Sequence, residues 1–269
     1  MTRIVNIGEA LIDEITRPNT APVEVVGGSM LNVAAGLTRL GHDCELATWF
    51  ADDARGAKVR EHAQNAGVTL TPGSDAAEFT TVAHASLDER GRATYEFDLS
   101  WDVPAVNDPD MVGHVHTGSY AVAVQPGGEK VLAAVKRQAI RGTVSYDPNI
   151  RPALLGTPDE ARPHVEAIVA LADVVKASDE DLEWLYPGRP VEDVIREWSQ
   201  SGPALIVCTR GPWGVYIKTE AERDMLVVDP LDVELVDTVG AGDSLMAGLI
   251  SGLLDADLLG SGEAKQRLR

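Results

Sequence analysis

Residues 237–254 read Asp237-Thr-Val-Gly240-Ala-Gly242-Asp243-Ser-Leu-Met-Ala-Gly-Leu-Ile-Ser-Gly-Leu-Leu254. Small residues run directly into an apolar helical stretch, so Gly240–Asp243 are predicted to form the first turn of a helix. The unpaired N–H groups of such a turn bind anions, and glycines let a phosphate approach the backbone. A carboxylate at Asp243 would repel that phosphate unless it accepts a proton from a hydroxyl that attacks phosphorus. A helix-capping carboxylate between turn glycines is the alternative interpretation.

A second glycine pair opens another predicted helix, in the stretch Gly27-Gly28-Ser-Met-Leu-Asn32-Val-Ala-Ala-Gly-Leu-Thr-Arg-Leu-Gly41. Apolar residues recur there at helical spacing, and Gly41 is placed to end the helix. Asn32 offers both a donor and an acceptor to a polyhydroxylated ligand. Asp13, just after the first strand, could accept hydrogen bonds from two hydroxyls. Cap and turn roles are the alternative, and for Asn32 alone they are favoured.

Short apolar runs alternate with helical patterns along most of the chain, which predicts a parallel sheet with helices on both faces. The runs are Ile4–Gly8, Cys44–Phe50, Val112–Thr117, Thr143–Asp147, Asp173–Ala177 and Leu205–Thr209. Ligands of such sheets bind at the carboxyl ends of the strands. Small, polar or charged residues follow all six runs, which favours a site at that edge.

Two segments interrupt this alternation and are strand-like. Residues 14–26 end in Val23-Glu24-Val25-Val26, and residues 79–97 alternate around a turn at 88–91, which indicates a β-hairpin. Together they predict a small sheet that acts as a lid. The whole chain, residues 1–269, is therefore interpreted as one α/β domain with this lid inserted.

Composition excludes several classes of protein. The 269 residues carry 23 Lys and Arg against 42 Asp and Glu, a formal charge of −19, which disfavours general binding to nucleic acids. No apolar run approaches the length of about 18 residues that a membrane span needs. The two cysteines, Cys44 and Cys208, have no metal-ligand spacing and cannot build a disulfide framework. With no secretory signal pattern, a cytoplasmic location is expected.

The sequence resembles the ribokinase-like (PfkB) carbohydrate kinases, and most of all their fructokinase branch. The resemblance covers Ile4 to Leu254 and includes the two glycine-rich stretches, Asp147-Pro-Asn-Ile-Arg151 and Thr209-Arg-Gly-Pro-Trp-Gly214, in the order typical of the family. It implies a three-layer αβα sandwich with a central, mostly parallel sheet and a β-sheet lid. It also implies ATP-dependent phosphorylation of a primary hydroxyl of a sugar, with fructose as the expected substrate and Mg²⁺ and K⁺ as metal cofactors.

The resemblance implies a role for each matching residue. Asp243 would be the catalytic base and Gly240, Ala241 and Gly242 the anion hole, with Arg151 near the substrate or the phosphates. The sugar would be held by Asp13, Gly27, Gly28 and Asn32. The nucleotide would be bound by Lys176, Ser178, Thr209, Arg210, Gly211 and Gly214. Metal ions would be held by Asp181, Asp237 and Val239. In many relatives such a lid pairs with a second copy, which implies a homodimer.

The sequence departs from the family pattern at two motifs. The Asn-x-x-Glu motif tied to Mg²⁺ reads Ser178-Asp-Glu-Asp181, and the Gly-Asp-x-x-x-Gly loop lacks its first glycine at Ala51. Relatives also continue beyond the position of Arg269 with a segment that closes the adenine pocket. An open adenine side, with weak discrimination between ATP and GTP, is therefore expected of residues 1–269.

Other functions stay open or are excluded on sequence. A ribokinase, a 2-keto-3-deoxygluconate kinase and a catalytically weak sugar- or nucleotide-binding homologue are the alternatives. A dinucleotide-dependent oxidoreductase is excluded, because no Gly-x-Gly-x-x-Gly follows the first strand. His114 and His116 share one side of a strand, but no third ligand at useful spacing supports a zinc site.

Overall fold

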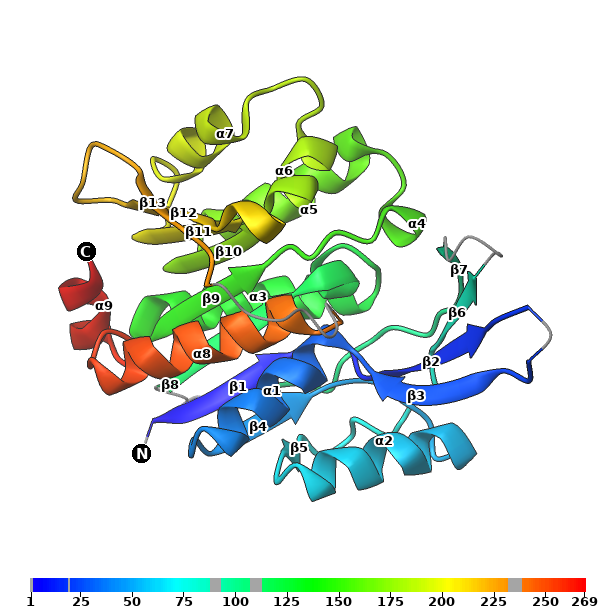
Figure 1. The fold of residues 1–269 in the computed structure, drawn as a ribbon. Helices are drawn as coiled ribbons and strands as arrows, with labels where there is room; N and C mark the ends of the chain where they lie inside the picture. Colours follow the sequence, from blue (N-terminus) through cyan, green and yellow to red (C-terminus); the bar gives the residue numbers. More distant parts are fainter. Residues whose placement is uncertain (1, 19, 88–92, 107–112, 232–238) are drawn as a thin grey trace.

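The computed structural model describes residues 2–18, 20–87, 93–106, 113–231 and 239–269. Within them, nine strands form a central sheet (Figure 1). From edge to edge these are β13 (Leu226–Val228), β12 (Val215–Thr219), β11 (Leu205–Thr209), β10 (Val174–Ser178), β9 (Thr143–Asp147), β8 (Gly113–Gly118), β1 (Arg3–Ile7), β4 (Cys44–Ala47) and β5 (Thr69–Leu70). All neighbours pair in parallel except β11 with β12 and β12 with β13.

Helices cover both faces of this sheet, as predicted. One face carries α1 (Ser29–Arg39), α2 (Ala54–Asn65) and α8 (Ala241–Asp255). The other carries α3 (Gly127–Arg141), α5 (Pro158–Val169), α6 (Asp179–Leu185) and α7 (Val191–Trp198). Strand residues alternate between the two cores, as Ile4 and Val5 do, because successive side chains point to opposite faces. The chain is thus a three-layer α/β sandwich.

Shorter elements complete the described residues: the helices α4 (Pro152–Leu155) and α9 (Gly262–Leu268) and the 3₁₀ turns η1 (Ser119–Val122) and η2 (Gly211–Trp213). The antiparallel edge strands β12 and β13 and the two-residue β5 were not predicted. Each is too short or too mixed in polarity to give a clear period. The helices of the described residues are all too short or too polar to cross a bilayer.

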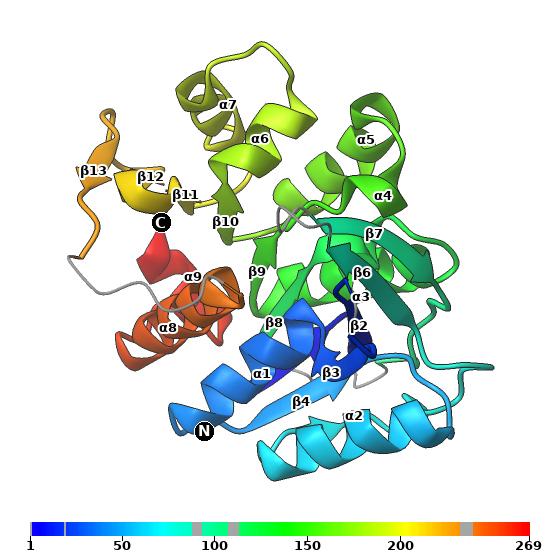
Figure 2. The same ribbon diagram turned by 45° about the vertical axis from the view of Figure 1, so that its right-hand side comes forward.

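A second sheet stands beside the first, in the order β3 (Val23–Gly27), β2 (Leu11–Thr16), β6 (Val82–Leu87) and β7 (Ala93–Asp98) (Figure 2). Its strands come from the two segments predicted to be strand-like. The first segment begins earlier than expected, at Leu11 rather than residue 14. Strands β6 and β7 pair in the predicted antiparallel manner, while their turn at 88–91 lies outside the described residues.

The buried pair His114 and His116 takes no part in a metal cluster within the described chain. His114 bonds the hydroxyls of Thr143 and Ser145 at 2.9 and 2.8 Å, and His116 bonds Ser145 at 2.9 Å. Burial lowers the pKa of both imidazoles to about 3, so they are neutral. They link β8 to β9 beneath α8 and have a structural role.

Helices α1 and α8 run side by side in both ribbon views, although they lie at opposite ends of the sequence (Figures 1 and 2). Gly36 makes this approach possible, since a Cβ added there would lie 2.8 Å from Cβ of Ala247. The close crossing fixes the start of α1 against the start of α8. The two glycine-rich turns singled out in the sequence therefore meet.

This contact predicts opposite effects for two identical substitutions. Gly36→Ala should lower the free energy of unfolding by about 1–2 kcal/mol, because overpacking outweighs the gain in helix propensity. Gly248→Ala on α8 should raise it by about 0.5–1 kcal/mol, since a Cβ there meets no atom within 4 Å. Denaturant unfolding measures both, and a stabilised Gly36→Ala variant would contradict the close packing.

Candidate active site

Asp243 lies in the first turn of α8. It follows Gly240 by three residues, and the backbone conformation at residue 240 favours glycine. Gly240 caps this helix with φ of 71°, in the left-handed region, and supplies no side-chain cap. The first N–H groups of α8 therefore have no side-chain cap, an arrangement that can bind an anion, and the anion hole stays a prediction. Asp243 itself is only 9% exposed.

Two side chains from α1 hold the carboxylate of Asp243. The hydroxyl of Ser29 donates to Oδ1 at 2.7 Å, and the amide of Asn32 donates to Oδ2 at 2.8 Å. The two hydrogen bonds fix the orientation of the carboxylate. The sequence assigned Asn32 to a sugar hydroxyl. The structure places its amide N–H on Asp243, and its contact with a sugar hydroxyl stays a prediction.

A buried ion pair borders the same helix start. Lys176 Nζ lies 2.8 Å from Oδ2 of Asp147, and both side chains are almost fully buried. Burial opposes the charge of Lys176, but the hydrogen bond and charge of Asp147, with the charges of Asp181 and Asp243, together raise the lysine pKa. A Cβ on Gly242 would sit 3.3 Å from this ammonium. Lys176 is thus a cation beside the predicted anion hole.

Asp13 lies on β2 against the diglycine. A Cβ on Gly27 would fall 1.9 Å from Oδ2 of Asp13, and one on Gly28, whose φ is 113°, would fall 2.5 Å from the carbonyl of Glu9. These glycines make room for neighbouring protein groups as well as for a ligand. Burial raises the pKa of Asp13, and the positive charge of Arg151 counters this. Asp13 and Arg151 therefore lie close enough for their charges to interact.

The predicted metal ligands are only partly brought together. Asp181 Oδ1 accepts the N–H of Ile150 at 2.7 Å, and Oδ2 accepts that of Ser178 at 2.9 Å. Asp181 and Ser178 thus form a capping box at the start of α6. Val239 is 86% exposed, and Asp237 lies outside the described residues. Asp147, whose pKa the charge of nearby Asp181 helps to raise, has a buried Oδ1 with no partner in the described part of the chain.

The loop predicted to bind nucleotide follows β11. Arg210 stacks on Tyr216, 4.0 Å from the ring centroid, and donates to the carbonyl of Trp213 at 3.0 Å. Its guanidinium therefore stabilises the loop, and contact between Arg210 and a phosphate stays a prediction. Gly211 and Gly214 adopt φ of 50° and 77°. Thr209 pairs in register with Ser178, so both residues lie at the site edge of the sheet.

Two residues of this site were missed in the sequence, Glu9 and Ser29. Glu9 follows β1, is 3% exposed, and accepts the N–H of Ser29 at 3.3 Å. Burial raises the Glu9 pKa to about 7, against the opposing effects of its own backbone, Ser119 and Arg151. A carboxylate directly after a strand is a signal that the sequence did contain. The link from Ser29 to Asp243 crosses 214 residues and left no local signal.

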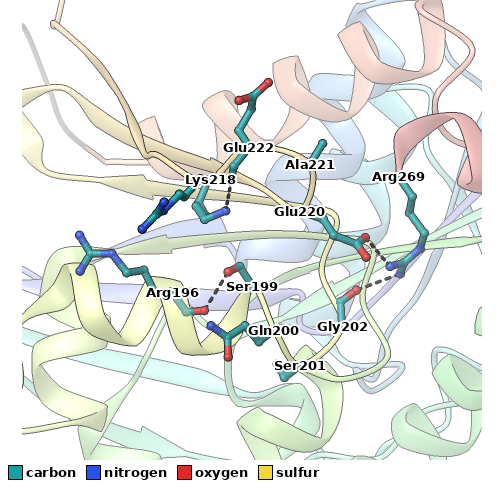
Figure 3. A pocket seen from close by; sticks show the side chains of 11 residues that line it. Arg196, Ser199, Gln200, Ser201, Gly202, Lys218, Glu220, Ala221, Glu222 and Arg269 are labelled. Atoms are coloured by element: carbon teal, nitrogen blue, oxygen red, sulfur yellow. Dashed lines mark hydrogen bonds and ion pairs between the residues drawn. The ribbon is translucent and has the colours of Figure 1, made fainter.

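A hollow of about 680 Å³ lies at the opposite edge of the sheet (Figure 3). Its polar groups mostly satisfy one another. Arg269 binds Glu220 and the carbonyl of Gly202 at 2.8 and 2.9 Å, and Lys218 Nζ bonds the carbonyls of Thr219 and Glu222. This hollow contains none of the predicted site residues.

Two buried carboxyls predict how stability changes with pH. Burial raises the pKa of Glu9 from 4.5 to about 7 and that of Asp147 from 3.8 to about 6. The folded chain holds these protons over a range where the unfolded chain releases them. Their contribution to stability is therefore complete at low pH and is lost as the pH rises through about 7.

Replacing Glu9 should isolate its contribution to the pH dependence of stability. When the pH is raised from 4.5 to 8, the unmodified chain should lose more stability than Glu9→Gln does. The free energy of unfolding of Glu9→Gln, relative to that of the unmodified chain, should rise by up to about 3 kcal/mol. Denaturant unfolding at both pH values measures it. A difference that does not change with pH would contradict the raised pKa.

Comparison with known proteins places these residues in context. A family model described as pfkB family carbohydrate kinase matches residues 1–264. The fructokinase of Rhizobium leguminosarum bv. trifolii is 32% identical over 268 residues, covering 94% of this chain and 80% of that protein. The fructokinase of Klebsiella pneumoniae is 31% identical over 258 residues, covering 92% and 83%.

Solved structures give the same picture. The apo fructokinase from Vibrio cholerae O395 superposes with a TM-score of 0.76 at 26% identity, covering 94% of this chain and 89% of that one. A double mutant of that fructokinase, bound to fructose, ADP and potassium ion, gives 0.77 at 25% identity, covering 94% and 84%.

Proposed function

Because the chain belongs to the pfkB family of carbohydrate kinases, we propose that it transfers the γ-phosphoryl group of ATP to a primary hydroxyl of fructose, with Asp243 as the base. The observation that carries this proposal is the placement of Asp243. A carboxylate oriented by two hydrogen bonds lies within the first turn of α8, next to N–H groups without a side-chain cap and to the Lys176 ammonium. A carboxylate at an anion hole serves to accept a proton as the phosphoryl group arrives.

The proposed reaction gives each of these groups a part. The sugar hydroxyl gives its proton to Asp243 as its oxygen bonds to the γ-phosphorus. The bond from phosphorus to the bridging oxygen breaks, and ADP leaves with that electron pair. The N–H groups of Gly240–Gly242 and the ammonium of Lys176 stabilise the charge that spreads over the transferring oxygens.

Mg²⁺ fits this site as an ion that arrives with ATP. It binds few protein ligands and keeps most of its waters. The unpartnered, buried Oδ1 of Asp147 and the carboxylate of Asp181 are the acceptors that would hold those waters. When bound, Mg²⁺ neutralises charge on the β- and γ-phosphates.

The sugar is proposed to lie over the diglycine, between Asp13 and Arg151. The second sheet is proposed to close over it and exclude water, which competes as a phosphoryl acceptor.

The edge strand β3 of this sheet exposes about half of Val23 and of Val25. A second copy that pairs there would cover both, and sedimentation that finds only monomers at every concentration would exclude the dimer.

Asp13→Asn is expected to raise the KM for fructose by about 10–100-fold, because hydrogen bonds from hydroxyls to a charged acceptor contribute about 1.5–3 kcal/mol. Gly27→Ala should act in the same direction, since its Cβ would displace the Asp13 carboxylate. Steady-state kinetics measures both variants. Asp98→Asn, on β7 of the same sheet and 66% exposed, is the matched control and should leave the KM unchanged.

A panel of sugars tests the proposed substrate. ADP release is followed with fructose, ribose, 2-keto-3-deoxygluconate and nucleosides, and fructose should give the highest kcat/KM. A preference for ribose or 2-keto-3-deoxygluconate would replace fructose but keep the chemistry. Binding of sugar without turnover of any member would favour a catalytically silent homologue.

A further inference from the structure

Helix α1 begins without a cap of its own. Its N-cap is Gly28, which has no side chain to accept the free N–H groups, and its first turn contains no acidic residue. Such an uncapped start is costly, since polar groups at a buried helix end need partners. Ser29, the first residue of α1, is nonetheless almost completely buried.

Glu9 supplies the missing acceptor from another element. It follows β1, and its Oε1 accepts the N–H of Ser29 at 3.3 Å. The backbone of Gly28 packs so closely on Glu9 that a Cβ at residue 28 would lie 2.5 Å from the Glu9 carbonyl. Close backbone packing therefore holds Glu9 and the start of α1 together. The helix dipole also favours a carboxylate at a helix start.

The same Ser29 holds Asp243. Its backbone N–H is bound by Glu9, while its hydroxyl donates to Asp243 Oδ1 at 2.7 Å. We infer that Glu9 is a positioning residue, which caps α1 and thereby holds Ser29 where its hydroxyl orients the Asp243 carboxylate. The inference deepens the proposed function, since it assumes that Asp243 is the base.

The ionisation of Glu9 supports this role. Burial raises its pKa to about 7, the nearby Ser119 hydroxyl and the positive charge of Arg151 lower it, and the negative charge of Asp243 raises it. Tyr120 also lies near enough for Glu9 to raise the pKa of its phenol. A hydrogen bond to a carboxylate is stronger than one to a protonated carboxyl, so the cap strengthens as the pH rises through neutrality.

Kinetic variants test whether Glu9 acts through Ser29. Glu9→Gln should lower kcat about tenfold at pH 8 with the KM of sugar and ATP within twofold, and should remove a rising limb of kcat near pH 7. Ser29→Ala should also lower kcat, and the double variant should be no slower than Ser29→Ala. The inference would be overturned if the loss of kcat in the double variant equalled the product of the two single losses. A Glu9→Gln variant with unchanged kcat and pH profile would also overturn it. Glu45→Gln, on β4 and outside the site, is the matched control.

A second measurement does not depend on turnover. Amide exchange of Ser29 should be faster in Glu9→Gln, and faster still in Glu9→Ala if that variant folds. An unchanged amide exchange rate of Ser29 in Glu9→Gln would show that Glu9 does not cap α1. If fructose is not phosphorylated, or Asp243→Asn keeps its activity, the proposed function fails while the exchange experiment still decides the role of Glu9 at α1.

Discussion

Asp243→Asn is expected to lower kcat by about 10²–10⁴-fold while the affinities for sugar and ATP change little. The substitution is nearly isosteric and removes the proton acceptor. An asparagine can still accept one of the hydrogen bonds that Ser29 and Asn32 donate. The helix start and its anion site should therefore persist, so the loss should fall on the chemical step.

Three measurements isolate that loss: kcat in the coupled assay, ATP affinity by calorimetry, and thermal unfolding. Asp255→Asn, on the exposed C-terminal end of the same helix, is the matched control and should behave as the unmodified chain does. Turnover by Asp243→Asn near that of the unmodified chain would identify Asp243 as a capping residue only.

Lys176→Met is expected to lower kcat by about 10²–10³-fold and to raise the KM for ATP. The variant removes the cation beside Gly242 and leaves Asp147 as an unpaired buried carboxyl. That carboxyl should then stay protonated to a higher pH, because Lys176 is what lowers its pKa against burial. Lost stability and lost catalysis would therefore coincide in the single variant.

A double variant separates the two effects. Lys176→Met combined with Asp147→Asn has no unpaired buried charge and should recover most of the lost stability. If Lys176 acts on the phosphates, the double variant should stay slower than Asp147→Asn alone, which shows how much of the loss belongs to the removed carboxylate. Recovery of both would mean that Lys176 serves only to neutralise Asp147.

The layered fold could be predicted because it is encoded in local patterns. All six predicted runs became strands β1, β4, β8, β9, β10 and β11, since buried parallel strands are continuous apolar runs bounded by small residues. The strands β12 and β13 were not predicted because β12 is only partly buried and the edge strand β13 is exposed, so neither needs such a run. Gly41, at φ of 95°, follows the end of α1 as predicted.

The site was less predictable, since its side chains are shared across elements. Asp181 occurs in a metal-like motif, but its position three residues after Ser178 equally well makes a capping box, and the structure contains that box. Arg210 was predicted to bind the nucleotide, and its guanidinium also stacks on Tyr216 of the next strand, a contact that the spacing of the motif does not reveal. Motif spacing names candidate groups, and only tertiary packing determines which groups remain free to bind a ligand.

The crossing of α1 with α8 also has a consequence during biosynthesis. Ser29 and Asn32 leave the ribosome more than 200 residues before Asp243, so the proposed base meets its partners only when synthesis is nearly finished. Until then α1 exposes Leu37 and the apolar stripe around it, which α8 later helps to bury. Nascent chains that stop before α8 should therefore be inactive and prone to aggregate, and they are natural clients for chaperones.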